Sequence, residues 1–159
     1  MGQAVELMGG ITRTFLPPFT IKSLTGQAIE SVWVSVIPWI QAALDYSRGE
    51  LSLEYVRSCL HAEQMQLWVA YEEGKILGVM VTQLLQHSHK KTCNVVAIDG
   101  KNITRIWREG AQYMITWLLA NDVDELEATC RDSVAAMLSG MNFERTANVM
   151  TYSLRRRPE

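Results

Sequence analysis

Apolar side chains recur along the chain with two different periods, and these periods predict its secondary structure. Between residues 29 and 44 the apolar positions are three and four residues apart, which is typical of one face of a helix. A second stripe of this kind predicts a helix over residues 103–120. Shorter helices are expected over residues 52–62 and 134–138.

Strands are predicted from runs in which apolar and polar residues alternate. These runs cover residues 19–24, 67–71, 76–85, 92–98 and 126–130, and a final pair of strands is expected within residues 143–154. The polar segment from Glu72 to Lys75 separates the second run from the third, which predicts a hairpin. The expected order of elements is therefore β-α-α-β-β-β-α-β-α-β-β.

This order predicts an α/β (α+β) fold with a mixed sheet. Hairpins cannot join all of these strands, so the third and fourth helices must act as crossovers, and helices are expected on both faces of the sheet. Residues 1–18 contain three glycines and two prolines without periodicity and are predicted to form an N-terminal arm. The folded domain is expected over residues 19–154, followed by a basic tail over residues 155–159.

Composition restricts the classes of protein to which the chain can belong. Its 159 residues are 48% hydrophobic and carry a formal net charge of −2, as is typical of one soluble domain with its own core. The near-neutral charge argues against a dedicated nucleic-acid-binding protein, which needs clustered Lys and Arg. No segment has the pattern of a signal peptide or of a membrane span, so a cytoplasmic protein without membrane contact is expected.

The cysteines and histidines do not form a metal-binding pattern. Cys59, Cys93 and Cys130 are odd in number and widely separated, which fits neither a disulfide framework nor a Cys-x-x-Cys site. Alternation would place His87 and His89 on one face of a strand, but no third ligand lies nearby, and a loop is the favoured interpretation. No metal is therefore expected.

One motif at the start of the helix over residues 103–120 points to a family. The sequence Arg105-Ile106-Trp107-Arg108-Glu109-Gly110, together with the order of elements, resembles the GNAT superfamily of acetyl-CoA-dependent N-acetyltransferases over about residues 19–154. In that family a [Q/R]-x-x-G-x-[G/A] motif opens this helix. The resemblance implies that Arg105, Arg108 and Gly110 bind the pyrophosphate of coenzyme A at backbone amides and the helix N-terminus.

The match to this motif is incomplete. Arg105 and Gly110 occupy its first and last positions, but Arg108 replaces the middle glycine, and its side chain obstructs a close approach of phosphate to the backbone. Without a cofactor, Arg105 and Arg108 are ordinary exposed residues of an amphipathic helix. Because cations are disfavoured at a helix N-terminus, their presence there favours a nearby anion.

A second GNAT motif, N-x-x-A-x-x-x-Y-x-x-x-G-F, is also altered. Counting back from Phe143, this sequence has Arg131, Val134, Leu138 and Asn142 in place of the Asn, Ala, Tyr and Gly of the motif. Leu138 cannot donate a proton, so general acid catalysis by this route is absent, whereas Asn142 can replace Gly because Asn tolerates left-handed backbone angles.

The catalytic residues are unknown. Glu72, Glu73 and Asp99 are candidate bases by residue type, but their turn positions favour ordinary solvated carboxylates.

Two main hypotheses of function follow from these departures. The chain resembles small GNAT-like proteins of phage particles in its length, its eroded phosphate motif and its leucine in place of tyrosine. It is therefore expected to be a non-catalytic structural or assembly protein, located in the host cytoplasm or the virion, without a cofactor. The alternative is an N-acetyltransferase that uses acetyl-CoA and acts on an amine, and a third hypothesis is an acyl-CoA or nucleotide binder that regulates without chemistry.

For a structural or assembly protein, the expected partners are other protein subunits. The expected contacts are the N-terminal arm, an exposed Trp39 beyond Pro38, and the run from Arg155 to Arg157. Placement of Trp39 in the core remains the other interpretation of that residue, and a solvated terminus is the other interpretation of the arginine run.

Overall fold

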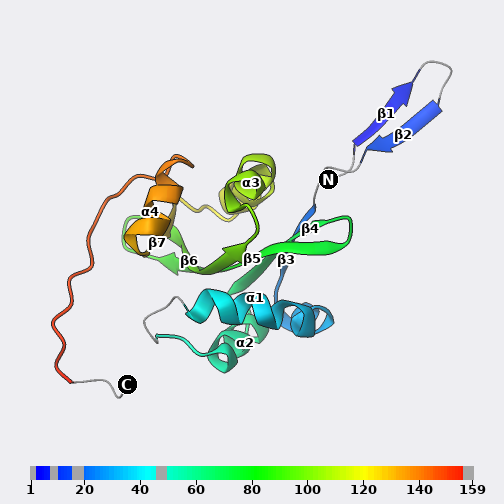
Figure 1. The fold of residues 1–159 in the computed structure, drawn as a ribbon. Coiled ribbons are helices and arrows are strands. Elements are labelled where there is room, and N and C mark those ends of the chain that lie inside the picture. The colour runs from blue at the N-terminus through cyan, green and yellow to red at the C-terminus, as the bar shows by residue number, and fades with distance from the viewer. Residues whose placement is uncertain (1–2, 8–10, 16–19, 46–49, 156–159) are drawn as a thin grey trace. The chain divides into compact units, whose positions relative to one another are not determined.

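A computed structural model describes residues 3–7, 11–15, 20–45 and 50–155 of the chain. The chain divides into two compact units, Met1–Ala128 and Thr129–Glu159. The first unit contains β1 (Gln3–Leu7), β2 (Ile11–Phe15), β3 (Thr20–Leu24), η1 (Gly26–Ser31), α1 (Trp33–Asp45), α2 (Leu53–His61), β4 (Gln66–Glu72), β5 (Lys75–Gln86), β6 (Lys91–Gly100), α3 (Ile103–Ala120) and β7 (Glu125–Ala128) (Figure 1). The second unit contains α4 (Asp132–Ser139).

Five strands of the first unit form one mixed sheet in the order β3-β4-β5-β6-β7. Strands β3, β4, β5 and β6 are paired antiparallel with one another, and β7 runs parallel to β6 after the crossover through α3. Glu73 and Gly74 form the tight turn between β4 and β5, and both have positive φ angles, of 50° and 78°. This backbone twist matches that of two paired strands and is easiest for a turn that contains glycine.

The two faces of the sheet are covered by different helices, as Figure 1 shows for α1 and α2 on one side and α3 on the other. Side chains of α1 and α2 pack with alternate residues of β4 and β5 in the larger cluster, which includes Ile40, Leu60 and Val81. On the opposite face, Met114 and Leu118 of α3 pack with residues of β4 and β6. No helix in the described ranges is long and apolar enough to cross a membrane.

Most of the predicted elements are confirmed, including the mixed sheet with helices on both faces. The helix predicted from residue 29 is divided, because the turn of 3-10 helix η1 comes before α1. The second helix begins as predicted, with the Ser52 side chain accepting a hydrogen bond from the Tyr55 amide at 3.1 Å. Trp39 is half-buried against the cluster that includes side chains of α1 and α2, so it is not the exposed apolar residue of α1. That residue is Val34, which is 82% exposed.

Two predicted segments differ from the structure. Residues 143–155 contain no strand, so the final strand pair predicted within residues 143–154 is wrong. The sequence predicts no strand within the arm of residues 1–18, but β1 and β2 pair antiparallel there. The rest of the arm, Phe19 at the start of a predicted strand, and the tail beyond Arg155 lie outside the described residues.

A buried polar group lies between the sheet and α3. The indole N–H of Trp68 donates to Thr82 Oγ1 at 2.9 Å, and the Thr82 hydroxyl donates to Gln66 Oε1 at 2.9 Å. Trp117 meets Trp68 edge-on, with 5.2 Å between ring centroids. Burial raises the pKa of the neighbouring Cys93 thiol to about 11, although its hydrogen bond with Thr82 acts in the opposite direction. The Cys93 thiol therefore stays protonated at neutral pH and is not a nucleophile.

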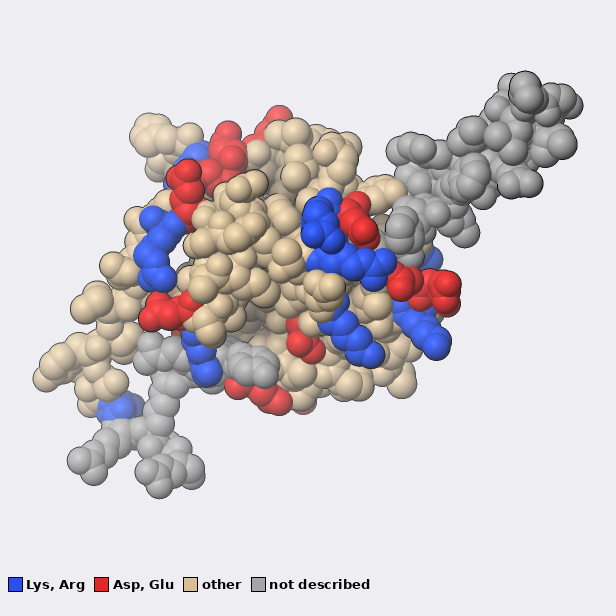
Figure 2. Space-filling view, turned by 45° about the horizontal axis from the view of Figure 1, so that its top comes forward, with Lys and Arg blue, Asp and Glu red and all other residues tan. Residues whose placement is uncertain are grey.

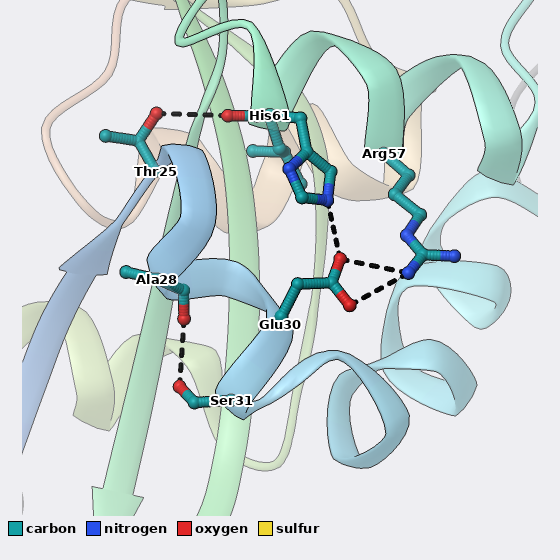
Figure 3. A network of polar contacts seen from close by, with 7 residues as sticks. Thr25, Ala28, Glu30, Ser31, Arg57 and His61 are labelled. Carbon is teal, nitrogen blue, oxygen red and sulfur yellow. Dashed lines mark hydrogen bonds and ion pairs between the residues drawn. The ribbon is translucent and has the colours of Figure 1, made fainter.

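On the other face, polar contacts join η1 to α2 (Figure 3). Glu30 accepts hydrogen bonds from Arg57 Nη2 at 2.9 Å and contacts His61 Nε2 at 2.5 Å. The guanidinium of Arg57 also lies 5.3 Å from the ring centroid of Trp33. The hydrogen bond from Arg57, followed by that from His61, lowers the pKa of Glu30 from its ordinary value of 4.5.

The buried hydroxyl of Thr82 is expected to be important for stability. The substitution Thr82→Val keeps the shape of the side chain but leaves Trp68 Nε1 and Gln66 Oε1 without this partner. We expect the free energy of unfolding, measured by urea denaturation, to fall by about 1–3 kcal/mol. Thr116→Val, the same change on the exposed side of α3, serves as control and is expected to change stability by less than about 0.5 kcal/mol. Equal effects of the two substitutions would contradict this role of Thr82.

The Glu30 contacts predict a pH-dependent contribution to stability. Because the folded-state pKa of Glu30 is lowered, its contribution is complete above pH 4.5 and is lost as the pH falls through the folded-state pKa. Glu30→Gln should therefore lower the free energy of unfolding at neutral pH, and the difference from the unsubstituted chain should disappear in acid. Urea denaturation between about pH 3 and pH 7 measures this, with Glu50→Gln at another exposed position as control. A difference that is the same at every pH would refute the prediction.

Candidate functional site

The candidate site lies where β6 passes into α3. β6 ends at Gly100 and α3 begins at Ile103, so Lys101 and Asn102 alone connect them. Asn102 has a left-handed backbone with φ of 53°, and its side chain accepts a hydrogen bond from the Arg105 amide at 3.2 Å. The Lys101 amide donates to the carbonyl of Leu77 on β5 at 2.8 Å. Helix α3 therefore starts directly against the sheet, without an intervening loop.

Two glycines permit this close approach. Gly78 of β5 lies opposite Gly100 of β6 in the strand register. A Cβ atom on Gly78 would lie 2.9 Å from the Asp99 carbonyl oxygen and 3.3 Å from Ile106 Cδ1, and a Cβ atom on Gly100 would lie 3.1 Å from the Gly78 Cα. The 2.9 Å contact is closer than side chains come to backbone atoms, so Gly78 is required for the close pairing of β5 with β6. The two glycines also leave room for Ile103 and Ile106 in the first turn of α3.

Arg105, the first residue of the predicted phosphate motif, lies between two carboxylates. Its Nη2 is 2.6 Å from Glu72 Oε2 at the end of β4, and its Nε is 3.2 Å from Glu109 Oε2 one turn further along α3. The hydrogen bond with Glu72 is the largest cause that raises the pKa of Arg105 above its ordinary value. Two negative charges this close offset much of the attraction of Arg105 for an anion.

Arg108 and Gly110 do not join Arg105 in one anion site. Arg108 is exposed, whereas Gly110 is buried in the same stripe of α3 as Met114 and Leu118. Free backbone amides belong to the first turn of a helix, and both residues lie beyond it, where the amides are bonded within the helix. The three residues therefore do not fit a coenzyme A site of the kind that the motif implies, and their role in binding remains a prediction.

β6 has an open edge next to the start of α3. In the described part of the chain, β7 pairs only with Thr92–Val95, and residues 96–100 of β6 continue past it. The register with β5 also shifts here, because Thr82 lies opposite Val95 whereas Val81 lies opposite Ala97. The backbone groups of an extended edge can hydrogen-bond an elongated ligand that carries amides.

Similarity to known proteins is found in structure and not in sequence. No protein-family model matches the chain. A search of curated proteins finds no match. Among solved structures, an aminoglycoside acetyltransferase from an uncultured soil metagenomic sample is 14% identical, with a TM-score of 0.63 over 87% of this chain and 97% of that chain. The chain has the GNAT fold.

Two further solved structures support this assignment. A predicted acetyltransferase from Clostridium acetobutylicum, solved with acetyl-CoA, is 9% identical, with a TM-score of 0.61 over 86% of this chain and 96% of that chain. A ribosomal-protein-alanine N-acetyltransferase from Brucella melitensis biovar Abortus 2308 is 12% identical, with a TM-score of 0.61 over 87% and 99% of the two chains. At such low identity the likeness extends to the fold alone.

The second GNAT motif falls on the unit that contains α4. Leu138, which replaces the tyrosine, is buried with 9% of its surface exposed. Asn142 has a φ of 68°, so the expectation that it can take the place of glycine in a left-handed conformation is confirmed. The amide of Phe143 donates to the Leu138 carbonyl at 3.1 Å and closes the end of the helix. The backbone of the motif is thus retained, while the residue that would act as an acid is apolar.

The three candidate bases are not brought together in this GNAT-fold chain. Glu72 is bound to Arg105, Glu73 lies exposed in the tight turn, and Asp99 is half-buried on β6. The pairing of Glu72 with Arg105 was not foreseen from the sequence, because the two residues lie 33 positions apart. The catalytic residues remain unknown.

The described residues contain no group of three His, Cys, Asp or Glu side chains placed to bind a metal ion. His87 Nε2 lies 3.0 Å from Thr92 Oγ1, just beyond the end of β5. Cys59 and Cys93 are buried free thiols, and Cys130 is an exposed one. These side chains supply no second site.

The contact at Gly78 predicts that even a small side chain there is destabilising. Gly78→Ala forces its Cβ against the Asp99 carbonyl oxygen, which the sheet holds in place. We expect a loss of about 1–3 kcal/mol in the free energy of unfolding, and a larger loss for Gly78→Val. Urea denaturation measures both variants, and circular dichroism shows whether each still folds. If Gly78→Ala is as stable as the unsubstituted chain, the close pairing of β5 with β6 does not depend on this glycine.

Proposed function

We propose that this GNAT-fold chain does not transfer acetyl groups and acts as a structural or assembly component of a phage particle. The observation that carries the proposal is the position of Arg105 between Glu72 and Glu109. An arginine already paired with two carboxylates is a poor ligand for pyrophosphate. The two-residue connection from β6 to α3 also leaves no loop whose amides could surround a phosphate.

The buried Leu138 supports the same proposal. A general acid must present a titratable group to the leaving thiolate, and the leucine at this position has none. A structural protein does not need a general acid at this position, because the packing of the fold does not depend on catalysis.

The proposed setting rests on the resemblance to small GNAT-like phage proteins in length and in both altered motifs. Other protein subunits are the proposed partners, contacted through the N-terminal arm and the basic tail. Val34 at 82% and Leu119 at 66% exposure add apolar side chains that a partner could cover. Figure 2 shows acidic and basic side chains interspersed over the face it draws, and this supports a protein partner over a nucleic acid. The proposed locations are the host cytoplasm and the virion.

A second candidate function is an N-acetyltransferase that acts on an amine. The open edge of β6 beside α3 favours it, because an amide-bearing cofactor could pair with residues 96–100. Several of the similar solved structures are acetyltransferases, and one of them was determined with acetyl-CoA.

Titration calorimetry with acetyl-CoA separates the two functions. We expect no saturable binding up to about 1 mM, that is, less than about 4 kcal/mol of binding free energy. Arg108→Gly, which restores the middle glycine of the motif, is the matched variant, and we expect it to remain without binding because Arg105 stays paired. Micromolar binding by the unsubstituted chain, together with acetylation of an amine, would overturn the proposal and establish the transferase. Micromolar binding without turnover would overturn it in favour of a regulatory binder.

A further inference from the structure

We draw no further inference here: the strongest candidate, the edge of β6 over residues 96–100 that β7 leaves unpaired in the described part of the chain, belongs to the site already described, and nothing in the structure shows what covers it.

Discussion

The structure depends on the close pairing of β5 with β6 at Gly78 and Gly100, beside which α3 begins. With no Cβ atom at either position, the first turn of α3 rests on the ends of β5 and β6, and two residues suffice for the connection. This contact fixes where α3 begins, and therefore which residues fall in its first turn. It places Arg105 within reach of Glu72, and it turns the stripe with Gly110, Met114 and Leu118 towards the sheet. The parallel pairing of β7 follows from the same crossover.

The same contact limits the chemistry of the site. The amide of Arg105 in the first turn of α3 is capped by Asn102, and the two-residue connection leaves no preceding loop to surround a phosphate. The arginine that could attract an anion is used to hold α3 to β4. Arg105 cannot hold α3 to β4 and bind an anion at the same time, and in this chain it holds α3 to β4 through Glu72. The open edge of β6 is the part of the site that this competition does not affect.

Elements with a strong hydrophobic period could be predicted from the sequence, because their pattern reflects the face that they bury. Helix α3 and the hairpin of β4 and β5 are predicted with bounds close to those observed. The site could not be predicted to the same extent, since it depends on contacts between distant residues. The pairing of Glu72 with Arg105 and the packing of Gly78 against Gly100 leave no signal in the local sequence. The motif itself located the start of α3, but not the side chains that bind Arg105 there.

The final strand pair shows a different limit of local patterns. Residues 149–154 have the alternation of a strand, and yet they form none in a single chain. A helix satisfies its own backbone hydrogen bonds, whereas a strand depends on an edge that another segment supplies. Alternation therefore indicates that a segment can form a strand, but it does not indicate which edge the strand pairs with. A strand can therefore be placed in a sheet only when the edge with which it pairs is also known.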